Sequence, residues 1–146
     1  MLPYELKPAD AAAVAQMLGR FELFRSLSSE QVGRLVPFVA LHRYGEGEVV
    51  IEKDAAGDAF YLIYSGEVEV TVPGLLSEKV VSRLGPGQFF GELALLLRQP
   101  RSATVVAVEE TDLFVLKSLD FEMVLERSPD IAALVRAVAK ERFDAL

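Results

Sequence analysis

The stretch GEGEVVIEKDAAGDAFYLIYSGEVEV, residues 45–70, decides the fold because it combines regularly spaced glycines with alternating apolar residues. Such a pattern is typical of short antiparallel strands joined by tight turns. The turn-forming glycines recur at intervals of 8–11 residues through this stretch and past it: Gly47, Gly57, Gly66, Gly74 and Gly85. This rhythm predicts a β-barrel or a β-sandwich for the middle of the chain.

Side-chain alternation supports strands between these turns. Val68, Val70 and Val72 fall on one side of a strand whose other side carries acidic and threonine side chains. Further strands are expected on the same pattern at residues 60–64 and 80–84, and as a pair at residues 103–107 and 113–117. Each run is short, so a single strand would bury little, and several must pack together.

The two ends of the chain have helical patterns instead. Apolar residues follow a period of about 3.6 from residue 14 to residue 21, and Ser28 with Gln31 has capping-box spacing for a second helix. Near the other end, Ser118 suits an N-cap, and the Ser-Pro pair at 128–129 suits an N-cap followed by the first residue of a last helix.

We therefore expect one domain over residues 1–146, mainly β with flanking helices. N-terminal helices occupy residues 1–37, the β-barrel occupies residues 38–117 with a short helical interruption at 90–104, and two C-terminal helices occupy residues 118–146.

The composition excludes several classes of function. The chain has no cysteine and a single histidine, His42, so no disulfide framework, cysteine nucleophile or multi-histidine metal site is available. Its formal net charge of −7 disfavours a nucleic-acid surface, which needs clustered Lys and Arg. No stretch reaches the ~18 apolar residues of a membrane span, and the N-terminus lacks the pattern of a secretory signal. We expect a cytoplasmic protein with no cofactor, no nucleic-acid contact and no membrane contact of its own.

One apolar segment interrupts the strand rhythm: FGELALLLRQPRSATV, residues 90–105. Its centre consists of good helix formers, and Gly91 at its start lets another group approach the free N–H groups of a first helical turn. An ionised Glu92 only accepts hydrogen bonds, whereas Arg101 can bind an anion bidentately. A ligand that satisfies both residues carries a phosphate and a nearby hydroxyl donor, as a cyclic nucleotide does.

The same residues are also compatible with a purely structural role. A glutamate in a first turn interacts favourably with the helix dipole without any ligand. Arg101 would then be a solvated residue at the start of a strand, or a partner of Glu92 itself. Spacing alone leaves both interpretations open.

The segment resembles the phosphate-binding cassette of the cyclic nucleotide-binding domain family. That family includes catabolite-activator-type regulators, the regulatory subunits of cAMP-dependent kinase and cyclic nucleotide-gated channels. Residues 90–95 and 100–103 match its pattern, Phe-Gly-Glu-Leu-Ala-Leu and Pro-Arg-Ser-Ala, without insertion or deletion. The resemblance covers about residues 20–144. It implies an antiparallel double-stranded β-helix, or jelly-roll barrel, that carries the cassette at 90–104 as a short helix.

The resemblance also implies a role for each matching residue. Glu92 corresponds to the acceptor of the ribose 2′-hydroxyl, and Arg101 corresponds to the partner of the phosphate. Ser102 lies where the family usually has Ala in cAMP readers and often Thr in cGMP readers. The backbone amides around the cyclic phosphate would come from Gly91, Leu93, Ala94 and Ala103.

The base is expected on the apolar inner face of the barrel. By alternation the candidates there are Val70, Val72 and Ser82, for which plain core packing is the other interpretation. The family commonly closes its last helix over the base, and this contact would come from Arg136 or from an apolar neighbour such as Val135. A solvated helical arginine is the alternative for Arg136.

We expect a non-catalytic sensor that binds a cyclic nucleotide, with cAMP favoured over cGMP because Ser102 lacks the methyl group of Thr. Binding would rearrange the C-terminal helices and act on a protein effector in trans or on a domain missing from this chain. A homodimer through the apolar helices is compatible with the sequence. The alternative is a ligand-free protein-interaction module on the same barrel, against which the retained Glu92 and Arg101 speak. An enzyme is not expected, since no metal-ligand cluster, Ser-His-Asp arrangement or cysteine nucleophile is available.

Overall fold

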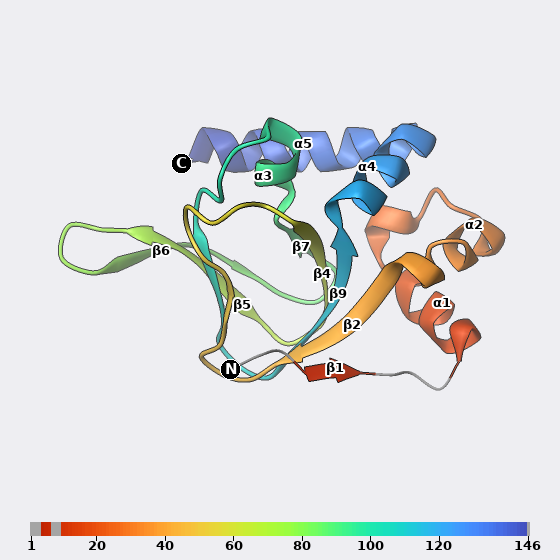
Figure 1. The fold of residues 1–146 in the computed structure, drawn as a ribbon, viewed down its shortest axis with the longest axis horizontal. Coiled ribbons are helices and arrows are strands. Elements are labelled where there is room, and N and C mark those ends of the chain that lie inside the picture. Colours follow the sequence, from red (N-terminus) through yellow and green to blue (C-terminus); the bar gives the residue numbers. More distant parts are fainter. Residues whose placement is uncertain (1–3, 7–9, 146) are drawn as a thin grey trace.

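The fold is known from a computed structural model that describes residues 4–6 and 10–145 (Figure 1). The strands are β1 (Tyr4–Leu6), β2 (Val39–Tyr44), β3 (Val49–Ile51), β4 (Ala59–Ser65), β5 (Val68–Pro73), β6 (Glu78–Leu84), β7 (Phe89–Phe90), β8 (Thr104–Ala107) and β9 (Thr111–Lys117). The helices are α1 (Ala11–Gly19), η1 (Glu22–Phe24), α2 (Ser29–Gly33), η2 (Val36–Phe38), α3 (Glu92–Leu97), α4 (Ser118–Arg127) and α5 (Pro129–Ala145). The expected mainly β chain with flanking helices is confirmed.

The strands form two separate antiparallel sheets, with the orders β1-β2-β9-β4-β7 and β3-β8-β5-β6. The expected barrel thus consists of two sheets, and no ladder among the described residues joins them into a closed one. β8 and β9 were expected to pair with each other, and this is wrong. The short connection between them leads from one sheet to the other, so β8 pairs with β3 and β5, whereas β9 pairs with β2 and β4.

β4 separates two apolar cores, because its alternate residues face opposite sides. Phe60 and Leu62 pack into a cluster shared with the helices, whereas Tyr61 and Ile63 pack into a cluster between the two sheets. All four side chains are buried. Burial on both faces explains why this strand reads as an unbroken apolar run in the sequence.

Side-chain caps mark the start of both N-terminal α-helices, and only the cap of α2 was predicted. Asp10 caps α1 by accepting a hydrogen bond from the Ala13 N–H at 2.8 Å. The capping box of α2 is confirmed, since the Ser28 N–H donates to Gln31 Oε1 at 2.8 Å and the Gln31 N–H donates to Ser28 Oγ at 3.2 Å. The sequence did not predict β1, which pairs with β2 inside the segment expected to be helical. Three residues are too few to show an alternation.

The C-terminal helices pack across the sheet that contains β4. Pro129 is the first residue of α5, as predicted, and Ser118 is the first residue of α4 rather than its cap. Ile131 and Val135 of α5 lie fully inside the core shared with the N-terminal helices. α5 also contacts α3, behind which it passes in Figure 1. None of the helices in the described part of the chain combines the length and apolarity needed to cross a membrane.

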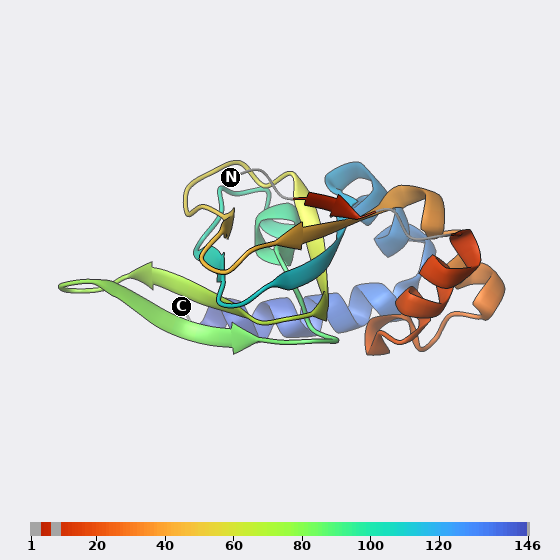
Figure 2. The same cartoon turned by 90° about the horizontal axis from the view of Figure 1, so that it is seen from below.

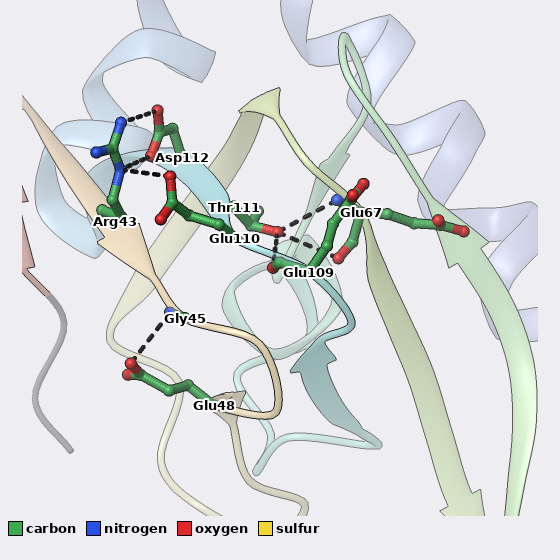
Figure 3. Close-up of polar contacts among 8 residues, drawn as sticks. All are labelled: Arg43, Gly45, Glu48, Glu67, Glu109, Glu110, Thr111 and Asp112. Carbon is green, nitrogen blue, oxygen red and sulfur yellow. Dashed lines mark hydrogen bonds and ion pairs between the residues drawn. The ribbon is translucent and has the colours of Figure 1, made fainter.

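Polar contacts fix the turns that join β4 to β5 and β8 to β9 (Figure 3). Thr111 is fully buried, and its hydroxyl donates to the Glu109 carbonyl at 2.9 Å and accepts from the Glu67 N–H at 3.2 Å. Beside it, Arg43 Nε donates to Asp112 Oδ1 at 2.8 Å, which links β2 to β9. These contacts hold the two turns together and satisfy the one hydroxyl that β9 buries there.

Candidate functional site

The predicted short helix interrupts the strands where expected. β7 ends at Phe90, α3 begins at Glu92, and Gly91 between them has φ +91°, in the left-handed region that favours glycine. A Cβ atom at Gly91 would stand 3.1 Å from the Ala59 carbonyl oxygen and 3.1 Å from Arg101 Nη1. Both the backbone conformation and the lack of space therefore require glycine at this position.

Arg101 is buried, with 5% of its surface exposed, at the end of the segment that follows α3. Its Nη1 donates to the Gly91 carbonyl at 2.7 Å, and its Nη2 donates to the Ala59 carbonyl at 2.8 Å. Asp58 Oδ1 lies 3.7 Å from Nη2, but the Asp58 side chain is mostly exposed. Burial lowers the pKa of the Arg101 guanidinium from its ordinary value, although Tyr61, Asp58 and Glu92 oppose this effect.

The geometry around Arg101 fixes its orientation without neutralising its charge. Two main-chain carbonyls use one N–H on each terminal nitrogen, and a guanidinium has five N–H donors in all. The partner with a full negative charge, Asp58, is too distant for a hydrogen bond and is well solvated. A buried cation held in this way is prepared to bind an anion.

Glu92 is almost completely buried, with 1% of its surface exposed, in the first turn of α3. Arg142 of α5 donates from Nη1 to Glu92 Oε1 at 2.7 Å, and its guanidinium carbon lies 5.2 Å from the ring centroid of Phe89. The ion pair and the cation–π contact tie the C-terminal part of α5 to the start of α3. The structure thus gives Glu92 a protein partner fifty residues away in the sequence.

A cavity of about 230 Å³ lies between α3, the sheet β3-β8-β5-β6 and the end of α5. Most of its wall is apolar and comes from both sheets, α3 and α5: Ile51, Val70, Val81, Leu84, Phe90, Leu93, Ala94, Ala103, Val105 and Ala145. Glu92, Arg101, Glu141 and Arg142 supply two negative and two positive charges. The cavity is therefore locally balanced although the chain as a whole carries −7, and an anionic ligand is not repelled there.

Most of the residues predicted from the sequence are brought together around this cavity. The structure places nine of them in its lining: Gly91, Glu92, Leu93, Ala94, Arg101, Ser102, Ala103, Val70 and Ser82. They come from α3 and the residues beside it, from β5 and from β6, which the fold assembles from three separate parts of the chain. Ser102 and Ser82 add hydroxyl groups to an otherwise apolar wall.

Val72 does not line the cavity. It follows Val70 by two residues and shares its face of β5, as the alternation predicted. However, β5 pairs with β8 only as far as Thr71, opposite Thr104, and Val72 pairs only with Lys79 of β6. Val72 therefore belongs to the projecting arm of the β5–β6 hairpin, where no opposite wall encloses a ligand.

Arg136 does not line the cavity either, and neither does Val135, which is fully buried in the core instead. The residue of α5 that reaches Glu92 is Arg142, which sequence reasoning missed. A signal for it existed, since Arg142 lies seven residues after Val135 and so extends the buried stripe of the helix, whereas Arg136 is one position off that stripe. Among the described residues, no group of His, Cys, Asp or Glu side chains could hold a metal ion.

The protein-family model that describes the cyclic nucleotide-binding domain matches residues 41–128 of this sequence. The chain belongs to the cyclic nucleotide-binding domain family. The domain is 33% identical, over 94% of its length, to a cyclic nucleotide-gated potassium channel of Mesorhizobium japonicum, of which it covers 37%. It is 34% identical, over 82% of its length, to the cyclic AMP receptor protein of Thermus thermophilus, of which it covers 56%.

Solved structures agree with this assignment. The crystal structure of the Thermus thermophilus catabolite activator protein superposes with a TM-score of 0.74 at 33% identity, covering 84% of the domain and 58% of that chain. The domain thus has the jelly-roll fold of this family. It spans from about a third to just over half of the length of the curated relatives described above.

Proposed function

We propose that the domain is a non-catalytic sensor that binds a cyclic nucleotide in the 230 Å³ cavity, with cAMP preferred over cGMP. The observation that carries the proposal is the pair of buried, oppositely charged residues, Glu92 and Arg101, in the wall of one apolar cavity. Burying two charges is costly unless they serve a partner. A cyclic nucleotide supplies an anion for Arg101 and a hydroxyl donor for Glu92.

In this proposal the cyclic phosphate lies at the start of α3. The first N–H groups of a helix have no partner within the helix, and Gly91, Leu93 and Ala94 all line the cavity. The amides of Gly91, Leu93 and Ala94 would surround the phosphate, and the free N–H groups of Arg101 would bind it from the other side. The backbone at Ala103 would complete this shell.

The base would lie against the apolar wall between the sheets. Val70 and Ser82 remain candidates for this contact, and the cavity adds Ile51, Leu84 and Val105 to them. Apolar side chains bind the two faces of a purine by burial and discriminate little between bases. The preference for cAMP therefore depends on Ser102, whose hydroxyl is retained but which lacks the methyl group of the Thr that many cGMP readers have. The name of the Thermus thermophilus relative, a cyclic AMP receptor protein, also supports cAMP.

The signal would pass through α5. Arg142 donates to Glu92, the same carboxylate that a ribose hydroxyl would use. Ligand binding would therefore change the contact between α3 and α5, and any output would depend on how much more tightly the ligand binds one arrangement of α5 than the other. The effector would be a protein in trans or a further domain of a longer chain.

Calorimetric titration with cAMP and cGMP tests the binding. We expect saturable binding of both, tighter for cAMP, and a ratio that moves toward cGMP in Ser102→Thr. Arg101→Gln should weaken cAMP binding about 100-fold, since it removes a bidentate contact between a cation and an anion. Arg136→Gln is the matched control, because it removes an arginine that does not line the cavity.

Two outcomes would contradict this proposal. Absence of heat and saturation with either nucleotide up to about 1 mM would favour the ligand-free interaction module instead. Equal affinity of Arg101→Gln and the wild type, in variants shown to be folded by circular dichroism, would place the phosphate elsewhere. A cytoplasmic location, the lack of catalysis and the lack of nucleic-acid binding remain predictions from the sequence.

Hydrogen exchange tests the relay separately. Saturating cAMP should change the protection of residues 129–145, which form α5. In Arg142→Gln the nucleotide should still bind, but the change in α5 should be much smaller because the coupled contact is absent. An unchanged response in that variant would mean that α5 senses the ligand through another contact.

A further inference from the structure

The β5–β6 hairpin projects from the body of the domain farther than any other labelled element (Figures 1 and 2). At its tip, Leu75 and Leu76 are 99% and 95% exposed. Single exposed leucines are ordinary, but two adjacent ones at the end of a projecting arm form an apolar surface that nothing in the domain covers. The hairpin is also two-stranded beyond Thr71, where the pairing with β8 ends.

The outer edge of the same hairpin is also unpaired. β6 is the last strand in the order β3-β8-β5-β6, so its backbone bonds to β5 on one side and to no described strand on the other. Val80 and Val81 in its middle are 44% and 38% exposed. A seven-residue strand with an open edge and apolar residues at its centre is a template for pairing with another strand.

The register of β6 against β5 shows which of its side chains share a face. Glu78 pairs with Pro73, Val80 pairs with Thr71, and Arg83 pairs with Glu69. These three residues of β5 are two apart and so share one face, and directly paired residues lie on the same face. Glu78, Val80 and Arg83 therefore lie on one face, and Lys79 and Ser82 lie on the other with Val72 and Val70. β6 has a β-bulge at this point, in which Val81 has no partner on β5. This extra residue reverses the alternation along β6, so that Glu78 and Arg83 share a face although they are five residues apart.

This arrangement makes β6 complementary to itself. When a second β6 runs antiparallel beside it, with the two-fold axis between Val80 and Val81, Glu78 of each copy lies opposite Arg83 of the other. Both residues are on the same face, so the pairing adds Glu78 of the other copy to each Arg83, whose Nη2 already lies 2.7 Å from Glu69 Oε1 of its own chain. Lys79 lies opposite Ser82 of the second copy, and the valines meet at the axis. No like charges are placed opposite each other in this register.

We propose that two copies of the chain associate through their β6 edges and join two four-stranded sheets into one continuous sheet. In this register Leu75 and Leu76 extend beside residues 85–87 of the second copy and are covered there. The apolar helices are less suited to this role, because Leu18, Phe21, Ile131 and Val135 are used in the core of the same chain. Val81 and Ser82 also line the cavity, so the interface adjoins the ligand site.

Sedimentation equilibrium without ligand tests the association. We expect a reversible dimer, and the combined variant Leu75→Ser with Leu76→Ser should raise its dissociation constant at least about tenfold, because two leucines per chain lose their cover. Leu119→Ser is the matched control, since this leucine of α4 is 77% exposed and lies away from the hairpin. Its dissociation constant should equal that of the wild type.

A charge exchange tests the register. Glu78→Arg and Arg83→Glu should each weaken the homodimer about tenfold, since each places like charges opposite each other at two points. An equimolar mixture of the two variants should form a mixed dimer with close to wild-type affinity, because opposite charges again face each other at both points. This recovery would also show that both variants are folded. The proposal is overturned if the chain stays monomeric up to about 0.5 mM. The exposed hairpin tip would then bind another protein or a membrane. A dimer unaffected by the hairpin variants, or a mixture that shows no recovery, also overturns the proposal.

Discussion

Replacing Arg142 by glutamine is expected to destabilise the ligand-free domain by about 2 kcal/mol at neutral pH. The substitution removes the charged donor that lies 2.7 Å from Glu92 Oε1. Glu92 then holds a carboxylate with 1% of its surface exposed and no ion pair, although Arg101 still acts on it electrostatically. Breaking a fully buried ion pair costs about 3–5 kcal/mol. The Arg142 side chain keeps 25% of its surface exposed, so water reaches that side of the pair and the expected cost is smaller.

Urea unfolding at pH 7, followed by far-ultraviolet circular dichroism, measures this loss. With an m value of about 2 kcal/mol/M, the midpoint should fall by about 1 M urea. Combining Glu92→Gln with Arg142→Gln should restore most of the stability, since no carboxylate is then buried without its ion-pair partner, and the cycle should give a coupling free energy of about 1.5 kcal/mol. Arg136→Gln on the same helix should change the free energy of unfolding by less than about 0.5 kcal/mol.

Two results would refute this reasoning. One is a midpoint for Arg142→Gln that equals that of Arg136→Gln, because Glu92 would then gain nothing from its partner. The other is a double variant no more stable than Arg142→Gln alone, because the loss would then come from the packing of the Arg142 side chain on Phe89 and not from the unpaired carboxylate.

Three further substitutions test other parts of the structure. Gly91→Ala should lower the free energy of unfolding by about 1–2 kcal/mol and weaken cAMP binding, because φ is +91° there; equal stability in urea would contradict the described turn. Thr111→Val should cost about 1–2 kcal/mol in the same assay, since it leaves buried backbone groups at the two turns without the Thr111 hydroxyl, and an unchanged midpoint would mean that water replaces it. Arg98→Gly should stabilise the domain by about 0.5–1 kcal/mol, because this exposed residue has φ +51°, and a lower melting temperature would show that its side chain makes a contact worth more than the strain.

Local patterns predicted the elements of this fold well. The capping box at Ser28, the proline that begins α5 and the helix after Gly91 were all placed correctly because each depends on residues within one turn of the backbone. The strands β4 to β6 followed from their alternation and from the glycines between them for the same reason. β1 was missed because three residues carry too little pattern.

In the candidate site, too, the residues close together in the sequence were predicted, whereas those that depend on strand pairing were not. Residues 90–105 alone identified Glu92, Arg101 and the short helix between them, because their spacing along the chain is also their arrangement in space. Alternation also indicated the face of Val70 correctly, but it could not show that β8 begins only at Thr104, beside Thr71, so that Val72 lies outside the cavity.

The sequence by itself determined which segments become strands or helices and which short segment carries the two buried charges, since these depend on neighbours along the backbone. Only the tertiary structure decided how the strands divide between two sheets, and that Arg142 rather than Arg136 is the arginine of α5 that reaches the site. Both depend on how elements distant in the sequence pack. A helix that is rotated by one residue changes direction by about 100°, and only its packing against the core determines which arginine faces the site.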